Sequence, residues 1–207
     1  MGNFSAEQDL TAYRSRGRQR RQDIIEAAAE ILREVGPAGV SHRTVAARAG
    51  CSLSATTYYF TGLDELLVEA GKVNIEGWAQ RAERVASEIA VLAPPQTLDA
   101  AVTAILRACL PSSGVLETHY LQLVASASSV SVTTAYRDGR ARLDTAVSTV
   151  LRVVGADLSA QLAIAVVDGA AVAALSEGRG VRETARERLT EILISKNWIP
   201  PAPPAGD

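Results

Sequence analysis

Residues 41–67 read SHRTVAARAGCSLSATTYYFTGLDELL, and this stretch decides the fold. Ser41 precedes a short predicted helix over residues 42–49, where its hydroxyl can accept a hydrogen bond from an early helical N–H. Gly50 follows where the chain must turn sharply, because glycine reaches positive φ without steric cost. Ser52 then caps a second helix. Two short helices joined by a tight turn predict a helix-turn-helix.

The second helix of this motif, residues 53 to about 59, is rich in hydroxyl groups. A helix with so little apolar surface is a poor core element. It is suited to the major groove of DNA, where hydroxyls and aromatic tips meet phosphates and base edges. The residues of the motif predicted to contact DNA are Ser41, His42, Arg43, Thr44, Ser52, Leu53, Ser54, Thr56, Thr57, Tyr58 and Tyr59.

An arginine run precedes the motif, although the whole chain has a net charge of −2. Residues 1–60 hold eight arginines against six acids, whereas residues 61–207 hold 13 basic against 17 acidic residues. A basic run beside a helix-turn-helix can neutralise phosphates or enter the minor groove, which makes binding salt-dependent. The alternative is an ordinary solvated tail. The arginines predicted to contact DNA are Arg14, Arg16, Arg18 and Arg20.

The motif resembles the DNA-binding domain of the TetR family of bacterial repressors over residues 18–67. Its matching residues are Ala49, Gly50, Ser52, Phe60, Asp64, Glu65, Leu66 and Leu67, with Cys51 in the position of the usual Val. Two positions depart from the family pattern. Thr57 stands where the first Tyr of the recognition helix is usual, and Leu63 replaces a Lys that would contact a phosphate.

The resemblance implies an all-α protein, with an N-terminal three-helix DNA-binding domain and a C-terminal helical bundle for effector binding and dimerisation. It further implies a homodimeric repressor that a small molecule releases from pseudo-palindromic operator DNA. An activator of the same fold remains an alternative. A helical ligand-binding or interaction module that does not act on DNA is another, but the arginine run beside the motif argues against it.

The composition agrees with packed helices, because the 47% hydrophobic share is mostly Ala, Val and Leu and only 4% is aromatic. Further helices are predicted over residues 18–35, 63–90, 97–110, 114–128, 132–154, 158–177 and 181–197. The predicted segments are a disordered lead (1–13), a DNA-binding domain (14–62), an effector and dimerisation domain (63–197) and a disordered tail (198–207).

Several functional classes find no support in the sequence. It contains no nucleophile motif, phosphate-binding glycine loop or zinc motif, so neither an enzyme nor a metal or cofactor is predicted. Cys51 and Cys109 fall in different predicted helices and suggest no disulfide, which favours a cytoplasmic location. The longest apolar run, residues 162–167, is too short to span a bilayer, so no membrane association is expected.

Residues 160–175, AQLAIAVVDGAAVAAL, are apolar nearly all the way round a helix, which must therefore be covered on two sides. With the next helix they resemble the dimerisation element of TetR proteins, a four-helix bundle formed with the symmetry mate. A monomer with one buried central helix is the alternative, but a two-fold protein matches two-fold operator DNA. The predicted interface residues are Val166, Ala170, Ala173, Ala174, Leu189 and Ile192.

An effector pocket between helices would be mostly apolar with a few polar groups. The candidate lining residues are Trp78, His119, Tyr120, Leu123 and Asp168. Other roles are open for three of them: Trp78 as a core plug, His119 as a surface residue, and Asp168 as a partner of a hydroxyl or an arginine within the fold or as a partner of a group across the dimer. A structural bond at Asp168 is plausible because an unpaired buried carboxylate is costly.

Overall fold

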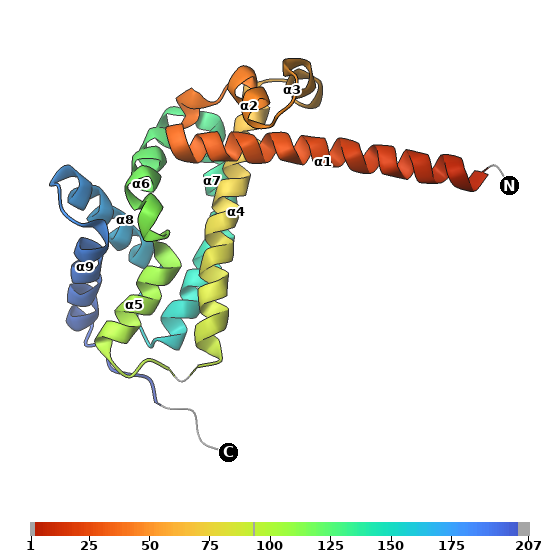
Figure 1. Cartoon of the computed structure of the whole chain (residues 1–207). Helices are drawn as coiled ribbons and strands as arrows, with labels where there is room; N and C mark the ends of the chain where they lie inside the picture. Colours follow the sequence, from red (N-terminus) through yellow and green to blue (C-terminus); the bar gives the residue numbers. More distant parts are fainter. Residues whose placement is uncertain (1–2, 93, 203–207) are drawn as a thin grey trace. The chain divides into compact units, whose positions relative to one another are not determined.

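The computed structural model of the chain describes residues 3–92 and 94–202, with side chains described from residue 14 onward except at 113. Its regular structure in these ranges is helical without strands, which confirms the all-α prediction (Figure 1). The elements are α1 (Asn3–Val35), η1 (Pro37–Gly39), α2 (His42–Arg48), α3 (Leu53–Tyr59), α4 (Leu63–Ala90), α5 (Leu98–Cys109), η2 (Ser113–Val115), α6 (Leu116–Ala125), η3 (Ser126–Ser128), α7 (Val130–Val153), α8 (Ala160–Ser176) and α9 (Val181–Ser195).

One predicted helix is divided into three elements in the structure. The single helix expected over 114–128 is α6 flanked by the short 3₁₀ turns η2 and η3. At its C-terminal end the Ser128 hydroxyl donates to the carbonyl of Ala125 at 2.8 Å. Serine hydroxyls compete in this way with the helical hydrogen-bond ladder, so the helix ends early.

The N-terminal lead is helical rather than disordered from Asn3 onward, which corrects the prediction for residues 3–13. No proline interrupts this stretch, so a helix anchored further along can propagate backwards at little cost per residue. Met1 and Gly2 lie outside the described residues. In the predicted tail, residues 198–202 lack regular structure, but the Trp198 indole N–H donates to the carbonyl of Val154 at 2.8 Å. Residues 203–207 lie outside the description.

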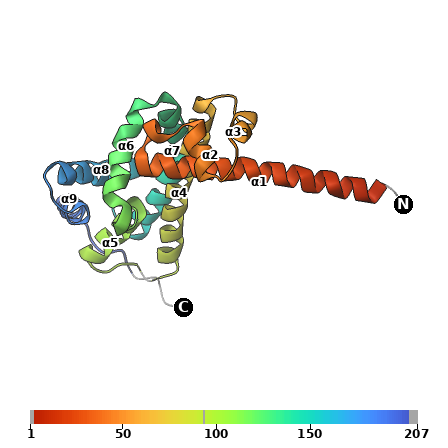
Figure 2. The ribbon, with the colours of Figure 1, turned by 45° about the horizontal axis from the view of Figure 1, so that its top comes forward.

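The first compact unit contains the described residues up to Asn74 together with 125–135. Within it α2 packs against α1 and α3 (Figure 2). Its core includes Ile24, Leu32, Val45 and Phe60, all fully buried or nearly so. Ile24 and Leu32 lie on α1, Val45 lies on α2, and Phe60 follows α3, so all three helices contribute to this core.

The second unit contains residues 75–124 and the described residues from 136 onward, so the two units divide inside α4 and α7. Within this unit α9 packs against α5 and α8 (Figure 1). Tyr120, Ile105, Leu151 and Leu193 are among its fully buried side chains. A Cβ on Gly139 would overlap Ile75, so glycine lets α7 cross α4 closely. No helix in the described part of the chain is long and apolar enough to cross a membrane.

Three residues predicted at a dimer interface belong instead to the core of this unit. Ala170, Ala174 and Leu189 are buried within the single chain, whereas Val166, Ala173 and Ile192 are partly exposed. The prediction is wrong for the first three because the sequence of α8 is apolar all round. Such a pattern does not show which side of the helix faces the chain's own core.

Candidate nucleic-acid interface and effector cluster

Local hydrogen bonds fix the two motif helices. The Ser41 hydroxyl accepts from the backbone N–H of Thr44 at 3.1 Å, and the Thr44 hydroxyl accepts from the N–H of Ser41 at 2.9 Å. The Ser52 hydroxyl accepts from the N–H of Ala55 at 3.2 Å. Gly50 has φ of +60° in the turn between them. These observations confirm both predicted caps and the glycine turn.

The outward side of α3 carries Leu53, Ser54, Thr57 and Tyr58, and the Tyr58 side chain is 79% exposed. Thr56 is different, because it is fully buried and its hydroxyl donates to the carbonyl of Leu53 at 2.8 Å. The predicted DNA contact of Thr56 is therefore wrong. Four residues before the buried Phe60, Thr56 lies on the side of the helix that faces the core.

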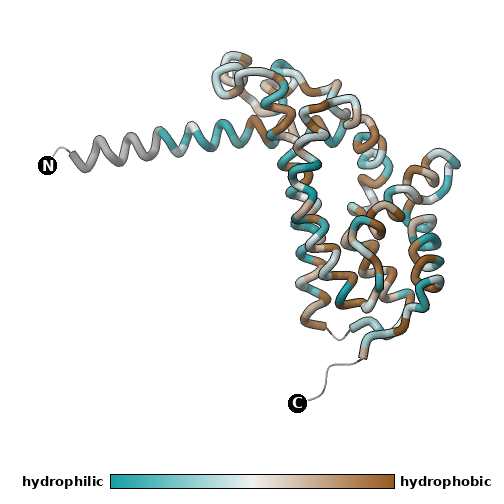
Figure 3. Tube along the Cα trace, turned by 180° about the vertical axis from the view of Figure 1, so that it is seen from behind, coloured by the Kyte–Doolittle hydropathy of each residue, from teal (hydrophilic) through white to brown (hydrophobic). Residues whose placement is uncertain are grey.

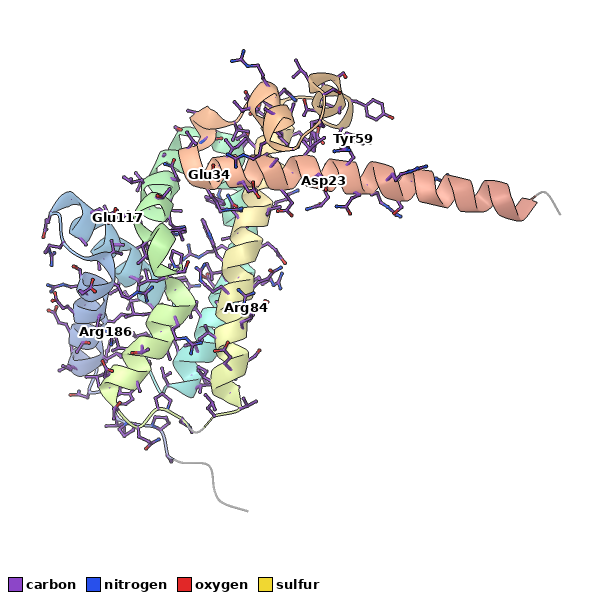
Figure 4. The ribbon with its side chains drawn as sticks, in the orientation of Figure 1. Asp23, Glu34, Tyr59, Arg84, Glu117 and Arg186 are labelled. Carbon is purple, nitrogen blue, oxygen red and sulfur yellow. The ribbon has the colours of Figure 1, made fainter. Side chains whose placement is uncertain are left out.

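Tyr59 also turns away from the outward side of α3. Its hydroxyl lies 3.7 Å from the position that a Cβ on Gly17 would occupy, so the side chain rests against α1 (Figure 4). Its ring meets the ring of Tyr58 edge-on, with the centroids 5.1 Å apart. Tyr58 thus extends outward, while Tyr59 supports it from behind.

On α2, Arg43 and Thr44 are exposed, and His42 is half-buried with its Nδ1 atom lacking a hydrogen-bond partner among the described residues. Arg48, at the end of α2, is also exposed and was not among the residues predicted to contact DNA. One of its Nη atoms lies 2.7 Å from a carboxylate oxygen of Glu34 on α1. This hydrogen bond lowers the pKa of Glu34, although an exposed pair of this kind stabilises the fold only slightly.

The basic run divides into free and paired arginines. Arg14, Arg16 and Arg18 are exposed without an ion partner among the described residues, and exposed Arg20 lies 3.9 Å from Asp23. Arg21 behaves differently and contacts three groups, Phe60, Glu65 and Glu69. Its guanidinium carbon lies 4.9 Å from the Phe60 ring centroid, and its Nη atoms lie 3.5 and 3.7 Å from the two carboxylates. Arg21 therefore anchors α1 to the start of α4.

In the second unit, aromatic side chains from three helices contact one another, and one of them is hydrogen-bonded to a carboxylate. The Trp78 ring lies 5.0 Å from that of His119 and 4.9 Å from that of Tyr136, centroid to centroid. His119 and Tyr120 meet edge-on at 5.0 Å, and the Tyr120 hydroxyl donates to Asp168 at 3.0 Å. We call Trp78, His119, Tyr120, Tyr136 and Asp168 the effector cluster.

The structure thus brings together four of the five predicted effector residues. Leu123 is half-buried and packs against the same core. Tyr136 could not be predicted as a member of the cluster, because the face that α7 presents to α4 is set by packing. Arg81, beside the cluster, was not predicted either; its Nε atom is buried without a hydrogen-bond partner among the described residues.

Burial controls the charge states in and beside the cluster. It raises the pKa of the Asp168 carboxyl, an effect opposed by the Tyr120 hydrogen bond, and it lowers the pKa of the Arg81 guanidinium. It also lowers the pKa of His119 to about 4, with a further contribution from the charge of Arg81. His119 is therefore a neutral ring at pH 7.

Replacing His119 by Gln should reduce the free energy of unfolding that the protein loses between pH 7 and pH 4. Because the pKa of folded His119 lies below its unfolded value near 6.5, the unfolded chain binds more protons between about pH 4 and 6.5. Stability is then lost as the pH falls through this window. We expect the parent to lose roughly 2 kcal/mol more than H119Q between pH 7 and 4, a figure that allows for the partial exposure of the ring. Urea unfolding at both pH values measures this difference, and identical losses would refute the assignment.

Comparison with known structures places these features in a family. The chain is similar to the multidrug binding protein EbrR, solved with imidazole, at 32% identity and a TM-score of 0.59, covering 88% of this chain and 97% of that one. It is also similar to a TetR-family member from Streptomyces coelicolor A3, at 30% identity and a TM-score of 0.57, covering 84% and 97%. This chain belongs to the TetR family.

The remaining comparisons agree with that assignment. The family model described as bacterial regulatory proteins of the tetR family matches residues 24–70 of this TetR-family chain. The HTH-type transcriptional regulator PksA of Bacillus subtilis (strain 168) is 40% identical over 68 residues, a match that spans 33% of the length of each protein. The predicted resemblance is confirmed, and the chain is a DNA-binding transcriptional regulator.

Proposed function

We propose that this TetR-family protein is a homodimeric cytoplasmic repressor that a small organic molecule releases from pseudo-palindromic operator DNA. The observation that carries the DNA-binding step is the outward side of α3. This short helix is capped by Ser52 and has Ser54, Thr57 and Tyr58 at exposed positions. A helix of this kind matches the major groove, where each half-site of the operator would receive one copy.

The effector cluster supports an aromatic cation as the releasing molecule. The four rings contact one another in sequence, and the Tyr120 hydroxyl donates to the half-buried carboxylate of Asp168, so a cation held against a ring face beside it would gain both cation–π and ionic attraction. EbrR, the relative described above, has been solved with proflavin, ethidium and malachite green. All three are aromatic cations. The positive charge of Arg81 beside the cluster would repel such a cation and lower its affinity.

The outward side of α8 supports dimerisation through this helix. Leu162 and Val172 are 43% and 44% exposed, and between them lie the exposed Ala165 and Gly169. Their spacing of three, four and three residues puts all four on one side of the helix. Nothing among the described residues lies within 4 Å of a Cβ placed on Gly169, so another helix could approach closely there. We infer that a second copy of α8 covers this side.

Duplex selection tests the function directly. The purified full chain is incubated with a random duplex pool, and retained sequences are amplified and tested by gel retardation. We expect an inverted repeat to be enriched, and proflavin to release it at concentrations that leave DNA itself unperturbed in a protein-free control. Failure to retain any duplex would refute DNA binding, whereas retention without release would refute only the proposed effector. A reporter transcribed from the selected site distinguishes repression from activation.

Changing Tyr58 to Phe should weaken operator binding on the order of tenfold, because a hydroxyl-to-phosphate hydrogen bond would be lost at each half-site. Tyr59→Phe serves as the matched control, since its hydroxyl lies against α1, and it should bind the operator nearly as the parent does. Gel retardation at fixed salt compares the two. Equal affinities for both variants and the parent would show that the Tyr58 hydroxyl is not a contact.

A further inference from the structure

Because the arginine run lies on α1, helical spacing sorts it into two faces. Residues three or four apart share a side of a helix, so Arg14 and Arg18 share one face with Gly17 and Arg21. Arg16 and Arg20 are four apart and lie on the other side. Figure 3 shows this part of α1 as hydrophilic, and the apolar part that enters the core follows it. The arginines are therefore held by the helix in two separate rows.

The face with Arg14 and Arg18 is the one that meets α3. Tyr59, the last residue of α3, rests on Gly17, and one turn further along the same face Arg21 contacts Phe60 (Figure 4). Ile24 and Ala28 continue this side of α1 into the fully buried core. Toward the N-terminus the same side of α1 is no longer covered by the core. Arg14 and Arg18 lie there, and both side chains are exposed near the C-terminal end of α3.

The two faces also differ in charge compensation. Arg14 and Arg18 have no ion partner among the described residues. On the other face Asp23 lies 3.9 Å from Arg20 and accepts a hydrogen bond from Gln19 at 2.9 Å. Of the four arginines predicted to contact DNA, the two on the side of α1 that adjoins the recognition helix both lack an ion partner among the described residues, whereas on the other side only Arg16 lacks one.

We propose that Arg14 and Arg18 bind DNA phosphates next to the half-site that α3 contacts, so that the N-terminal part of α1 is a helical basic arm. The proposal rests on the DNA-binding function proposed above and adds a second contact surface to it. Duplex DNA presents a phosphate about every 1.7 Å along its axis, which gives both guanidinium groups acceptors within reach. The helix fixes the spacing of the two arginines, so less freedom is lost on binding than with a disordered tail.

Two matched double variants of the full chain test this proposal. R14Q/R18Q and R16Q/R20Q remove the same charge from the same helix, and glutamine keeps its helix propensity. Binding of the selected duplex is measured from 50 to 200 mM salt, and circular dichroism verifies the helix content. Each lost phosphate contact makes the negative slope of log affinity against log salt less steep by about 0.9. We expect the slope of R14Q/R18Q to be less steep than that of the parent by about two units per subunit, and the slope of R16Q/R20Q to stay close to the parental slope.

The outcomes distinguish a failure of the DNA-binding function from a failure of the basic arm alone. If the parent retains no duplex, the proposed DNA-binding function fails and the arm fails with it. If the parent binds but R14Q/R18Q has the parental slope, only the arm is refuted. Equal losses in the two variants would also refute it, because the charge would then act without regard to the face of α1.

Discussion

Replacing Val172 by Arg is expected to convert the dimer into a monomer and to lower operator affinity by about a hundredfold or more. Val172 lies on the outward side of α8 proposed as the seam between subunits. An arginine there would bring a buried charge without a partner, at a cost of several kcal/mol. One half-site contact would remain where two are needed, and each 1.4 kcal/mol lost is a tenfold change in affinity. Light scattering and gel retardation on the same samples measure both effects.

Two further arginine variants make this test specific. Ser148→Arg places the same charge at an exposed position on α7 and should leave assembly and DNA binding unchanged. Ala174→Arg places it in the core of the single chain and should unfold the protein rather than yield a folded monomer. A V172R protein that stays dimeric and binds DNA as the parent does would show that this side of α8 is not the interface.

Opposite changes in proflavin affinity are expected when the two charges at the effector cluster are removed singly. Asp168→Asn deletes the carboxylate but keeps an acceptor for the Tyr120 hydroxyl, so proflavin should bind about tenfold more weakly. Arg81→Gln deletes the neighbouring cation and should strengthen binding by a similar factor. Calorimetric titration of the full chain measures both. The Asn variant should also fold at least as stably as the parent, since burial disfavours the charged form of Asp168.

A change of charge outside the cluster provides the control for this pair. Glu117 is exposed at the start of α6, and Glu117→Gln removes one negative charge without touching the rings. Its proflavin affinity should match that of the parent. Equal weakening by D168N and E117Q would indicate general electrostatics, and parental binding by D168N would remove Asp168 from the site.

Features fixed by neighbouring residues could be predicted from the sequence. The caps at Ser41 and Ser52, the turn at Gly50 and the bounds of α4 were all correct. Each depends on the backbone chemistry of a few consecutive residues, such as a hydroxyl beside a free N–H or a glycine at positive φ. The family resemblance followed from the same short motif.

Features that depend on the rotation of a helix about its axis could be determined only from the tertiary structure. Thr56 turned inward rather than toward DNA, and Ala174 joined the core rather than the outward side of α8. The contact between Trp78 and Tyr136 joins residues 58 positions apart, and no pattern in the neighbouring sequence predicts it. In uniformly hydroxylated or uniformly apolar helices, composition does not reveal orientation. The sequence therefore determined which helices form and where most of them begin and end, and packing between helices decided which side chains remain free to bind.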